Sequence, residues 1–261
     1  MCVGTRLQNN SLSLKDINRR KHAISYSYLK MDTISADELK FKHPFSMLLS
    51  GARRTGKTHF VKTLLMRQDE YITPMAEWIC WFSPGSSTQN EVFTELKESI
   101  SNITFFDSLP SEGILGYVRE MHPGLRILII IDDLMEEASK RSDVKHLFTR
   151  GRHEDISVIF LTQNAFHKGK HFREMSLNTD YFVIFKNVRD ASTISHLASQ
   201  MKTTHFLPLA YKDATLGKYS YLLLDYRSDT DERVRYRAEI FDNERVIVYQ
   251  PTDSINSSIK R

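Results

Sequence analysis

The residues best suited to chemistry form one glycine-containing segment, GARRTGKT, which runs from Gly51 to Thr58. It has the pattern GxxxxGK[ST], follows the apolar stretch FSMLLS and precedes the amphipathic stretch HFVKTLL. Glycines let the backbone wrap closely around phosphate groups, so that successive N–H groups point inward. Between a strand and a helix, such a loop binds the phosphates of a nucleoside triphosphate. The alternative is a chance match, which the strand–loop–helix context disfavours.

The spacing within this segment predicts how ATP and Mg²⁺ would be held. The ammonium of Lys57 would reach the β- and γ-phosphates, and the hydroxyl of Thr58 would coordinate the magnesium ion. The helix that starts near Lys57 adds the positive end of its dipole. The nucleotide contacts that we expect come from Gly51, Ala52, Arg53, Arg54, Thr55, Gly56, Lys57, Thr58 and His59.

A second candidate motif is acidic and ends the apolar run RILIIIDDLM. We expect Asp132 to lie beside the P-loop strand and to hold Mg²⁺ through water. The next residue commonly polarises the attacking water, and glutamate is usual there. Here it is Asp133, one methylene shorter, so Glu136 or Glu137 are alternatives as the base. The simpler interpretation of the acidic pair is a strand-end cap.

A third element is the apolar stretch SVIFLTQN, which ends in polar residues. Parallel sheets bind ligands in the crevice at the carboxyl ends of their strands. Gln163 therefore becomes a candidate for sensing the γ-phosphate or orienting water.

Short apolar runs alternate with amphipathic stretches after Phe41, which predicts an α/β fold with a mainly parallel sheet. The expected strands are Phe45–Ser50, Glu77–Phe82, Ile103–Phe106, Arg126–Ile131, Ser157–Thr162 and Tyr181–Lys186. The expected helices are Lys57–Arg67, Thr88–Ser99, Glu112–Met121, Asp143–Thr149 and Asp190–Met201. Near the end, YSYLLLDY and RVRYRAEIF flank the polar RSDTDE and predict a C-terminal β-hairpin.

The chain of 261 residues divides into three expected parts. Residues 1–40 are polar and would form an arm outside the main domain, mobile or partly helical. Residues 41–250 would form the P-loop ATPase domain, and residues 251–261 a flexible tail.

The composition indicates a soluble globular protein, with 41% hydrophobic residues, 26% charged residues and a formal net charge of +4. No apolar run approaches the roughly 20 residues of a membrane helix, and no secretory signal is evident. We read Cys2 and Cys80 as reduced thiols.

Basic residues gather between Lys140 and Arg173, where they outnumber the acidic ones. They are Lys140, Arg141, Lys145, Arg150, Arg152, Lys168, Lys170 and Arg173. Such a stretch is either a solvated face or a surface that meets the phosphates of a nucleotide or of DNA.

Taken together, these motifs resemble the FtsK–HerA superfamily of ring-forming, DNA-pumping ATPases. The resemblance is strongest to the genome-packaging ATPases of Polinton/Maverick elements and adintoviruses, relatives of the poxvirus packaging ATPase. The phrases that carry it are FKHPFSMLLSGARRTGKT, IIIDDLM, LFTRGRHEDISVIFLTQNAFHKGKH, SLNTDYFVIFKNVRD and YLLLD, which together span Phe41 to Asp225.

The resemblance implies a three-layer, RecA-like P-loop fold and ATP hydrolysis coupled to translocation of double-stranded DNA into a capsid. It also implies a homo-oligomeric ring, a pentamer or hexamer, with capsid or portal-vertex proteins as partners and no membrane. An arginine would be supplied to the γ-phosphate of the neighbouring subunit, and the matching position is Arg152, with Arg150 beside it. The location would be the host nucleus, a cytoplasmic virus factory or the virion. Two features depart from the family pattern: the acidic pair is DD rather than DE, and residues 1–40 have no counterpart.

A basic loop after Gln163 supplies the DNA-contact candidates Lys168, Lys170, His171 and Arg173. Contacts to phosphates would make binding insensitive to base sequence.

Two other functions stay open. One is a helicase or partitioning ATPase of the same superfamily, although strand separation needs stacking aromatics or a wedge. The other is a non-catalytic ATP-binding scaffold, which the intact Lys57, Thr58 and Asp132 disfavour. A small-molecule kinase is a more distant alternative, because nothing resembles a lid with paired arginines.

Overall fold

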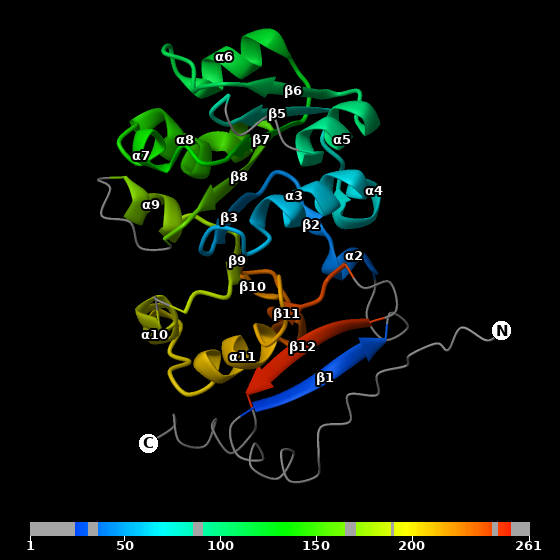
Figure 1. Cartoon of the computed structure of the whole chain (residues 1–261), viewed down its shortest axis with the longest axis vertical. Coiled ribbons are helices and arrows are strands. Elements are labelled where there is room, and N and C mark those ends of the chain that lie inside the picture. Colours follow the sequence, from blue (N-terminus) through cyan, green and yellow to red (C-terminus); the bar gives the residue numbers. More distant parts are fainter. Residues whose placement is uncertain are drawn as a thin grey trace, which may run out of the picture.

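The computed structural model describes residues 24–30, 36–85, 91–164, 171–188, 191–241 and 245–251. One long sheet runs through the molecule, with helices packed against both of its faces (Figure 1). Its strands are, in spatial order, β1 (Ile24–Lys30), β12 (Arg245–Pro251), β11 (Tyr236–Ala238), β10 (Tyr221–Asp225), β9 (Tyr181–Phe185), β3 (Ser46–Ser50), β8 (Ile156–Thr162), β7 (Ile127–Ile131), β5 (Trp78–Phe82) and β6 (Ile103–Phe106). A separate parallel pair joins β2 (Phe41–Lys42) to β4 (Ile72–Thr73).

The half of the sheet from β9 to β6 is parallel throughout. Every residue of β3, β7, β8 and β9 is buried, as expected for strands covered on both faces. The structure therefore confirms the predicted α/β fold with a mainly parallel sheet.

Two groups of helices make the outer layers. On one face lie α3 (Lys57–Met66), α4 (Gln68–Tyr71) and α5 (Glu91–Ser99) (Figure 1). Each face of the sheet has its own hydrophobic core cluster. The cluster on the opposite face contains side chains of α6 (Ile114–Met121), α8 (Ser142–Arg150), α9 (Phe172–Leu177), α10 (Ala191–Gln200) and α11 (Leu207–Ala214). The two clusters bury alternate residues of the same strands, so that Ile129 faces one layer and Ile130 the other. Shorter elements complete the fold: α2 (Ala36–Leu39), α7 (Met135–Ala138), η1 (Gly151–Glu154) and η2 (Glu232–Val234).

The predicted strands of the parallel half agree with the observed ones to within one residue at each end. The predicted helices agree with the observed ones to within two residues at each end. The exception is the start of the helix predicted over Thr88–Ser99, because residues 88–90 lie outside the described residues. The predicted hairpin is also confirmed, because β10 pairs with β11 in antiparallel register.

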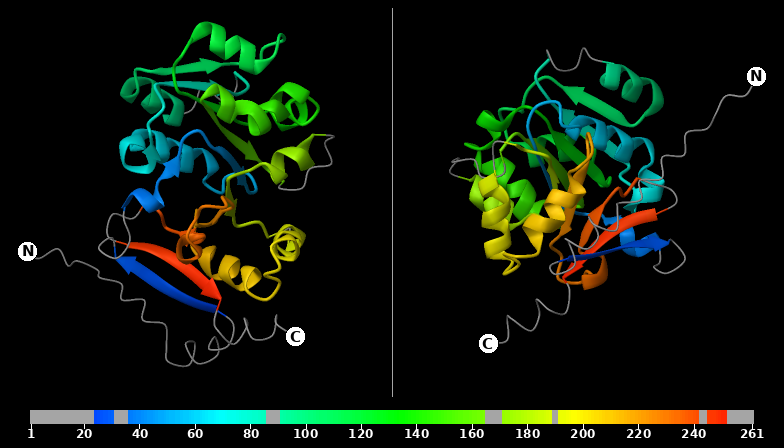
Figure 2. Two further views of the ribbon diagram at one scale, coloured as in Figure 1. Left: turned by 180° about the vertical axis from the view of Figure 1, so that it is seen from behind. Right: turned by 60° about the horizontal axis from the view of Figure 1, so that its bottom comes forward.

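The antiparallel half extends further than the sequence predicted. β12 pairs with β11, and β1 pairs with β12, placing Tyr28 opposite Ile247. The two outer strands lie side by side at one end of the molecule (Figure 2). Residues 24–30 were expected in an arm outside the domain, and that expectation is wrong for this segment. Residues 1–23 and 252–261 lie outside the described residues.

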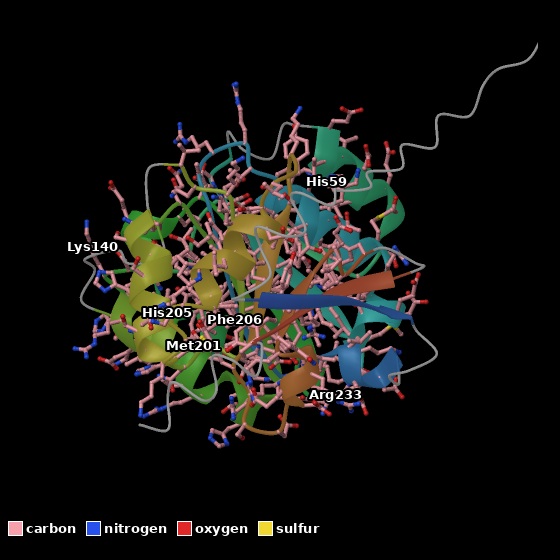
Figure 3. All side chains as sticks on the ribbon, turned by 90° about the horizontal axis from the view of Figure 1, so that it is seen from below. His59, Lys140, Met201, His205, Phe206 and Arg233 are labelled. Carbon is pink, nitrogen blue, oxygen red and sulfur yellow. The ribbon has the colours of Figure 1, made fainter. Side chains whose placement is uncertain are left out.

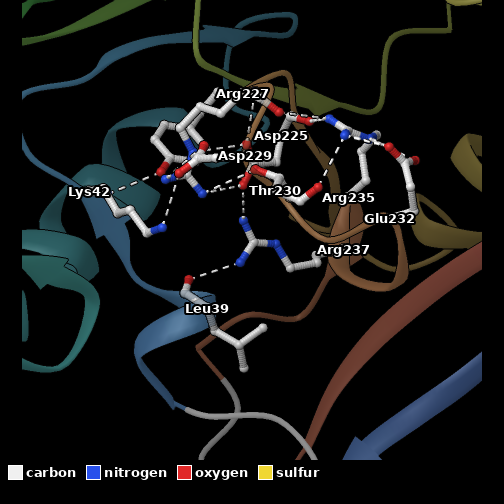
Figure 4. A network of polar contacts seen from close by, with 10 residues as sticks. Leu39, Lys42, Asp225, Arg227, Asp229, Thr230, Glu232, Arg235 and Arg237 are labelled. Atoms are coloured by element: carbon white, nitrogen blue, oxygen red, sulfur yellow. Dashed lines mark hydrogen bonds and ion pairs between the residues drawn. The ribbon is translucent and has the colours of Figure 1, made fainter.

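A buried charge cluster ties this antiparallel half to the start of the domain (Figure 4). Asp225, fully buried at the end of β10, accepts hydrogen bonds from Arg227 Nη2 at 3.0 Å and Arg237 Nη2 at 3.2 Å. Arg237 is only 1% exposed, and its other terminal nitrogen donates to the carbonyl of Leu39 at 2.9 Å. Burial of these cations is tolerable because Asp225 supplies the opposite charge.

The parallel strands bring their carboxyl ends to one edge of the sheet. The P-loop follows β3, the acidic pair follows β7 and Gln163 follows β8, so all three motifs leave the sheet at this edge. In the view from below, His59 beside the P-loop and Arg233 beyond β10 lie on opposite sides of the molecule (Figure 3).

Candidate functional site

The loop between β3 and α3 requires glycine at two positions for different reasons. A Cβ on Gly51 would lie 2.6 Å from Phe185 Cβ and 2.8 Å from Thr55 Oγ1, so no larger residue fits. Gly56 precedes α3 with a φ of 104°, a backbone conformation that residues with a side chain rarely adopt. The two glycines of the motif are thus explained by space and by backbone geometry respectively.

The ammonium of Lys57 lies over this loop. It donates to the carbonyl of Gly51 at 2.6 Å and to that of Ala52 at 3.0 Å. Burial lowers the pKa of Lys57, while Asp132 and Asp133 act in the opposite direction. A cation held among loop carbonyls in this way is placed to meet an anion that enters the loop.

The first acidic residue meets the P-loop directly. Thr58 Oγ1 lies 3.3 Å from Asp132 Oδ2, and the backbone N–H of Asp132 donates to Phe82 O at 2.9 Å. The strand that precedes Asp132 is not adjacent to the P-loop strand, because β8 lies between β3 and β7. The side chains nevertheless converge, because the helix after the P-loop carries Thr58 across the end of β8.

The electrostatics of Asp132 favour a cation. Burial, reinforced by the neighbouring charge of Asp133, raises the pKa of Asp132 to about 6, although Lys57 and the Thr58 hydroxyl lower it. Because burial and a like charge disfavour the ionised form of Asp132, a cation that approaches the carboxylate stabilises that form.

Asp133 and Gln163 face each other at the ends of neighbouring strands. Gln163 Nε2 donates to Asp133 Oδ1 at 3.2 Å, and both side chains are exposed to solvent. Asp133 has a φ of 56°, in the left-handed region that aspartate enters more readily than most residues other than glycine. The pair could hold a water molecule between the two motifs.

The alternative bases lie elsewhere. Glu137 pairs with Arg141 at 3.2 Å on the surface of the segment around α7, and Glu136 is exposed. Asp133 is therefore the acidic residue after Asp132 that contacts another motif residue.

Hard oxygen ligands at this edge suit Mg²⁺. Thr58 and Asp132 offer one hydroxyl and one carboxylate, and Mg²⁺ typically takes one or two protein groups together with phosphates and water. Among the described residues, no group of three or more His, Cys, Asp or Glu side chains is arranged to hold a metal ion by itself. The donor set thus fits an ion that arrives with a nucleotide.

The two candidate arginines lie at the other edge of the sheet. Arg152 belongs to η1, directly before the amino end of β8, and Arg150 is the exposed last residue of α8. Arg152 Nη2 pairs with Asp180 Oδ1 at 3.1 Å, and the side chain of Arg152 is 57% exposed. Since β8 has seven residues, roughly 20 Å of strand separates Arg152 from the P-loop edge.

The basic loop is described only in part. Lys168 and Lys170 lie outside the described residues, whereas Arg173 is exposed near the start of α9. His171 is partly buried, and its backbone N–H donates to Ser139 O at 3.4 Å.

Sequence reasoning missed Tyr219, which lies against the P-loop. It lines a cavity of about 440 Å³ together with residues 54–59, and a second of about 620 Å³ beside Ala52. The stretch YSYLLLDY predicts a strand that starts at Tyr219, but β10 begins two residues later, at Tyr221. The available signal was the pair Gly217 and Lys218, which marks a loop before the apolar run.

Two further features of the chain are its buried cysteine and the character of its helices. Cys80 is a buried free thiol, and burial raises its pKa to about 12, which fits a core residue. None of the described helices has the length and apolar character needed to cross a bilayer.

Part of the chain matches a known protein family. Residues 112–207 match the family model described as "Poxvirus A32 protein". This stretch is less than half of the chain and includes Asp132, Asp133, Arg152 and Gln163, whereas the P-loop precedes it. No curated protein matches the sequence.

Several solved structures are similar to this chain at low sequence identity, each with a TM-score below 0.5. The genome packaging NTPase of Sulfolobus turreted icosahedral virus 2, in complex with AMPPCP, is 14% identical over 75% of this chain and 96% of that chain, with a TM-score of 0.49. A KaiC-like protein from Pyrococcus horikoshii OT3 is 12% identical over 87% of this chain and 100% of that chain, with a TM-score of 0.45. The cytoplasmic domain of the Thermomonospora curvata type VII secretion ATPase EccC is 13% identical over 80% of this chain and 25% of that chain, with a TM-score of 0.43.

Proposed function

We propose that this protein is an ATP-hydrolysing motor of the genome-packaging type, which moves double-stranded DNA into a capsid. One observation carries the hydrolysis: motifs from three distant parts of the sequence meet at one edge of the sheet, with Thr58 3.3 Å from Asp132 and Gln163 3.2 Å from Asp133.

The P-loop residues would bind the triphosphate. The backbone of the loop from Gly51 to Gly56 surrounds the phosphates, and the ammonium of Lys57 leaves the carbonyls of Gly51 and Ala52 to pair with the β- and γ-phosphates. Thr58 would contact the magnesium ion, and Asp132 would hold it through a water molecule. The bound ion neutralises charge on the phosphates.

Asp133 and Gln163 would position the attacking water. The Asp133 carboxylate can accept a proton from water, and the Gln163 amide can orient that water toward the γ-phosphate. Their mutual hydrogen bond at 3.2 Å supports a shared role at this edge of the sheet.

A ring of subunits would complete each site. Arg152 lies at the edge of the sheet away from its own P-loop, so it could act on a γ-phosphate only in another copy of the chain. A planar and always charged guanidinium suits the charge that spreads over the phosphoryl oxygens during transfer. Arg150 is the alternative donor on the same edge.

DNA packaging is supported by two kinds of similarity. The first is the match of residues 112–207 to the model of the poxvirus A32 protein. The second is the sequence resemblance described above, which points to the packaging ATPases of Polinton/Maverick elements. Phosphate contacts from Lys168, Lys170, His171 and Arg173 would hold the duplex without reading its sequence.

Two assays separate a packaging motor from a helicase of the same superfamily. A duplex translocase should displace the third strand of a DNA triplex in the presence of ATP and Mg²⁺, and it should leave a forked duplex paired. A helicase should instead separate the fork. A non-catalytic scaffold should do neither, and the Lys57→Ala protein is the control for ATP dependence in both assays.

A further inference from the structure

A cavity of about 620 Å³ adjoins the P-loop on the side of β9 and β10. One wall consists of the P-loop residues Ala52, Arg54 and Thr55. The other wall consists of residues 186–188, which follow β9, and residues 216–220, which precede β10. A molecule that extends from the phosphate loop toward the antiparallel strands would enter this cavity.

Large apolar side chains stand exposed around the cavity. Val188 is 87% exposed, Leu216 is 56% exposed and Tyr219 is 53% exposed. A cluster of exposed apolar groups in a concave site is typical of a surface that a ligand covers.

The backbone at Tyr219 is held in an unusual conformation. Its φ is 65°, which is an outlier for a bulky aromatic residue and is energetically unfavourable. A Cβ on Gly56 would lie 3.2 Å from Tyr219 Cβ, so the glycine of the P-loop also makes room for this side chain. Strain of this kind persists where surrounding structure enforces it, and it is concentrated at functional sites.

The ring of Tyr219 is half exposed and contacts a cation. Lys218 Nζ lies 4.8 Å from the centroid of the ring, a cation–π contact that occupies one face. Lys218 contacts only one face of the ring. An aromatic base can stack on the ring of a tyrosine.

We infer that this cavity receives the nucleobase of the triphosphate and that Tyr219 stacks on the base. The inference rests on the proposed function, because the phosphates in the P-loop fix where the rest of the nucleotide can lie. Tyr219 is then a residue that sets nucleotide affinity through the base, whereas Lys57 acts through the phosphates. Arg54 and Thr55 line both cavities and lie between the two halves of the ligand.

The test compares a ligand that has a base with one that lacks it. Binding of ATP and of inorganic tripolyphosphate, each with Mg²⁺, is measured by calorimetry for wild type, Tyr219→Gly and Tyr219→Phe. Glycine suits the positive φ at this position, so loss of the ring does not add backbone strain. Leu177→Ala is the matched control, because Leu177 is a 64% exposed apolar residue on α9, away from both cavities.

The inference predicts that Tyr219→Gly weakens ATP binding at least about fivefold, the lower end of the effect of losing one stacked base. Tripolyphosphate binding should stay within about twofold, and Tyr219→Phe and Leu177→Ala should match wild type for both ligands. Equal weakening of both ligands, or no weakening of ATP, overturns the inference. A change of oligomer mass with unchanged ATP affinity also overturns it and assigns the cavity to a subunit contact.

The same data distinguish this inference from the proposed function. Wild type that binds neither ligand contradicts the proposed function and, with it, the base site. Wild type that binds ATP and tripolyphosphate with equal affinity contradicts the base site alone.

Discussion

The hydroxyl of Thr58 lies 3.3 Å from the Oδ2 atom of Asp132, although 74 residues separate them in the chain. The segment with Thr58 follows β3 and Asp132 follows β7, and β8 lies between these two strands in the sheet. The approach of Thr58 and Asp132 brings a hydroxyl and a half-buried carboxylate together beside the P-loop, which is where we propose that Mg²⁺ is held.

The raised pKa of Asp132 makes stability depend on pH. Its pKa is about 6 in the folded protein against 3.8 ordinarily, so the folded state holds a proton that the unfolded state has lost between these values. The free energy of unfolding should therefore fall as pH rises from about 4 to about 6, by at most about 3 kcal/mol.

Asp132→Asn should remove this dependence. Without Mg²⁺ or nucleotide, the variant should be more stable than wild type at pH 7.5, and the difference should vanish near pH 4. Urea unfolding at a series of pH values in EDTA measures it. A variant that is less stable than wild type at pH 7.5 would contradict the effect of burial.

Asp133 should act as the base. Asp133→Asn should lower the rate of ATP hydrolysis about 100-fold while leaving ATP affinity within about twofold, because the carboxylate would act only on the attacking water. Glu136→Gln is the control, since Glu136 is exposed and carries the same charge. A loss in Glu136→Gln as large as that in Asp133→Asn would contradict the assignment of the base to Asp133.

The parallel half of the fold could be predicted from sequence because its strands are fully buried. Continuous apolar runs such as Ile127–Ile131 have few alternative structures, and helices of 3.6-residue period separate them. The candidate residues after β7 and β8 could be predicted from these strands, because parallel strands bring their carboxyl ends to one edge of the sheet.

The rest depends on contacts between distant segments. The residues of β1, ISYSYLK, alternate Ile and Tyr with Ser and are compatible with a strand, but its pairing with β12 joins segments at opposite ends of the sequence. The approach of Tyr219 to the P-loop depends on how the loop before β10 ends, which local patterns do not determine. The order of β3, β8 and β7 is likewise a property of the whole sheet.

Asp225 should be essential for stability. Asp225→Asn leaves Arg227 and Arg237 without their buried counter-charge and should cost about 3–5 kcal/mol of unfolding free energy. Asp229→Asn removes a carboxylate that is 61% exposed and pairs with Lys42, so it should cost less than about 1 kcal/mol. Urea unfolding compares them, and equal costs would contradict the role given to Asp225.

Arg152 should act between subunits. Arg152→Ala should leave ATP binding and folding nearly unchanged, because the Arg152–Asp180 pair is exposed on the arginine side, yet it should lower ATP hydrolysis by roughly 10³-fold.

Mixed oligomers test whether Arg152 acts on the next P-loop. Arg152→Ala subunits keep their P-loop, and Asp132→Asn subunits keep their arginine, so some interfaces in a mixture become complete. Equal amounts should restore up to about a quarter of wild-type hydrolysis if each site is built by two subunits. No activity above that of the separate variants would contradict the shared site.

We propose that the edge formed by the P-loop, Asp132 and Gln163 hydrolyses ATP to drive movement of duplex DNA. The most direct measurement is phosphate release by size-fractionated oligomers with ATP and Mg²⁺, with and without blunt duplex DNA, for wild type and Lys57→Ala. We predict that duplex DNA raises the wild-type rate and that Lys57→Ala releases no phosphate above background under either condition. A wild-type rate that duplex DNA leaves unchanged, or a rate that survives Lys57→Ala, would contradict the account.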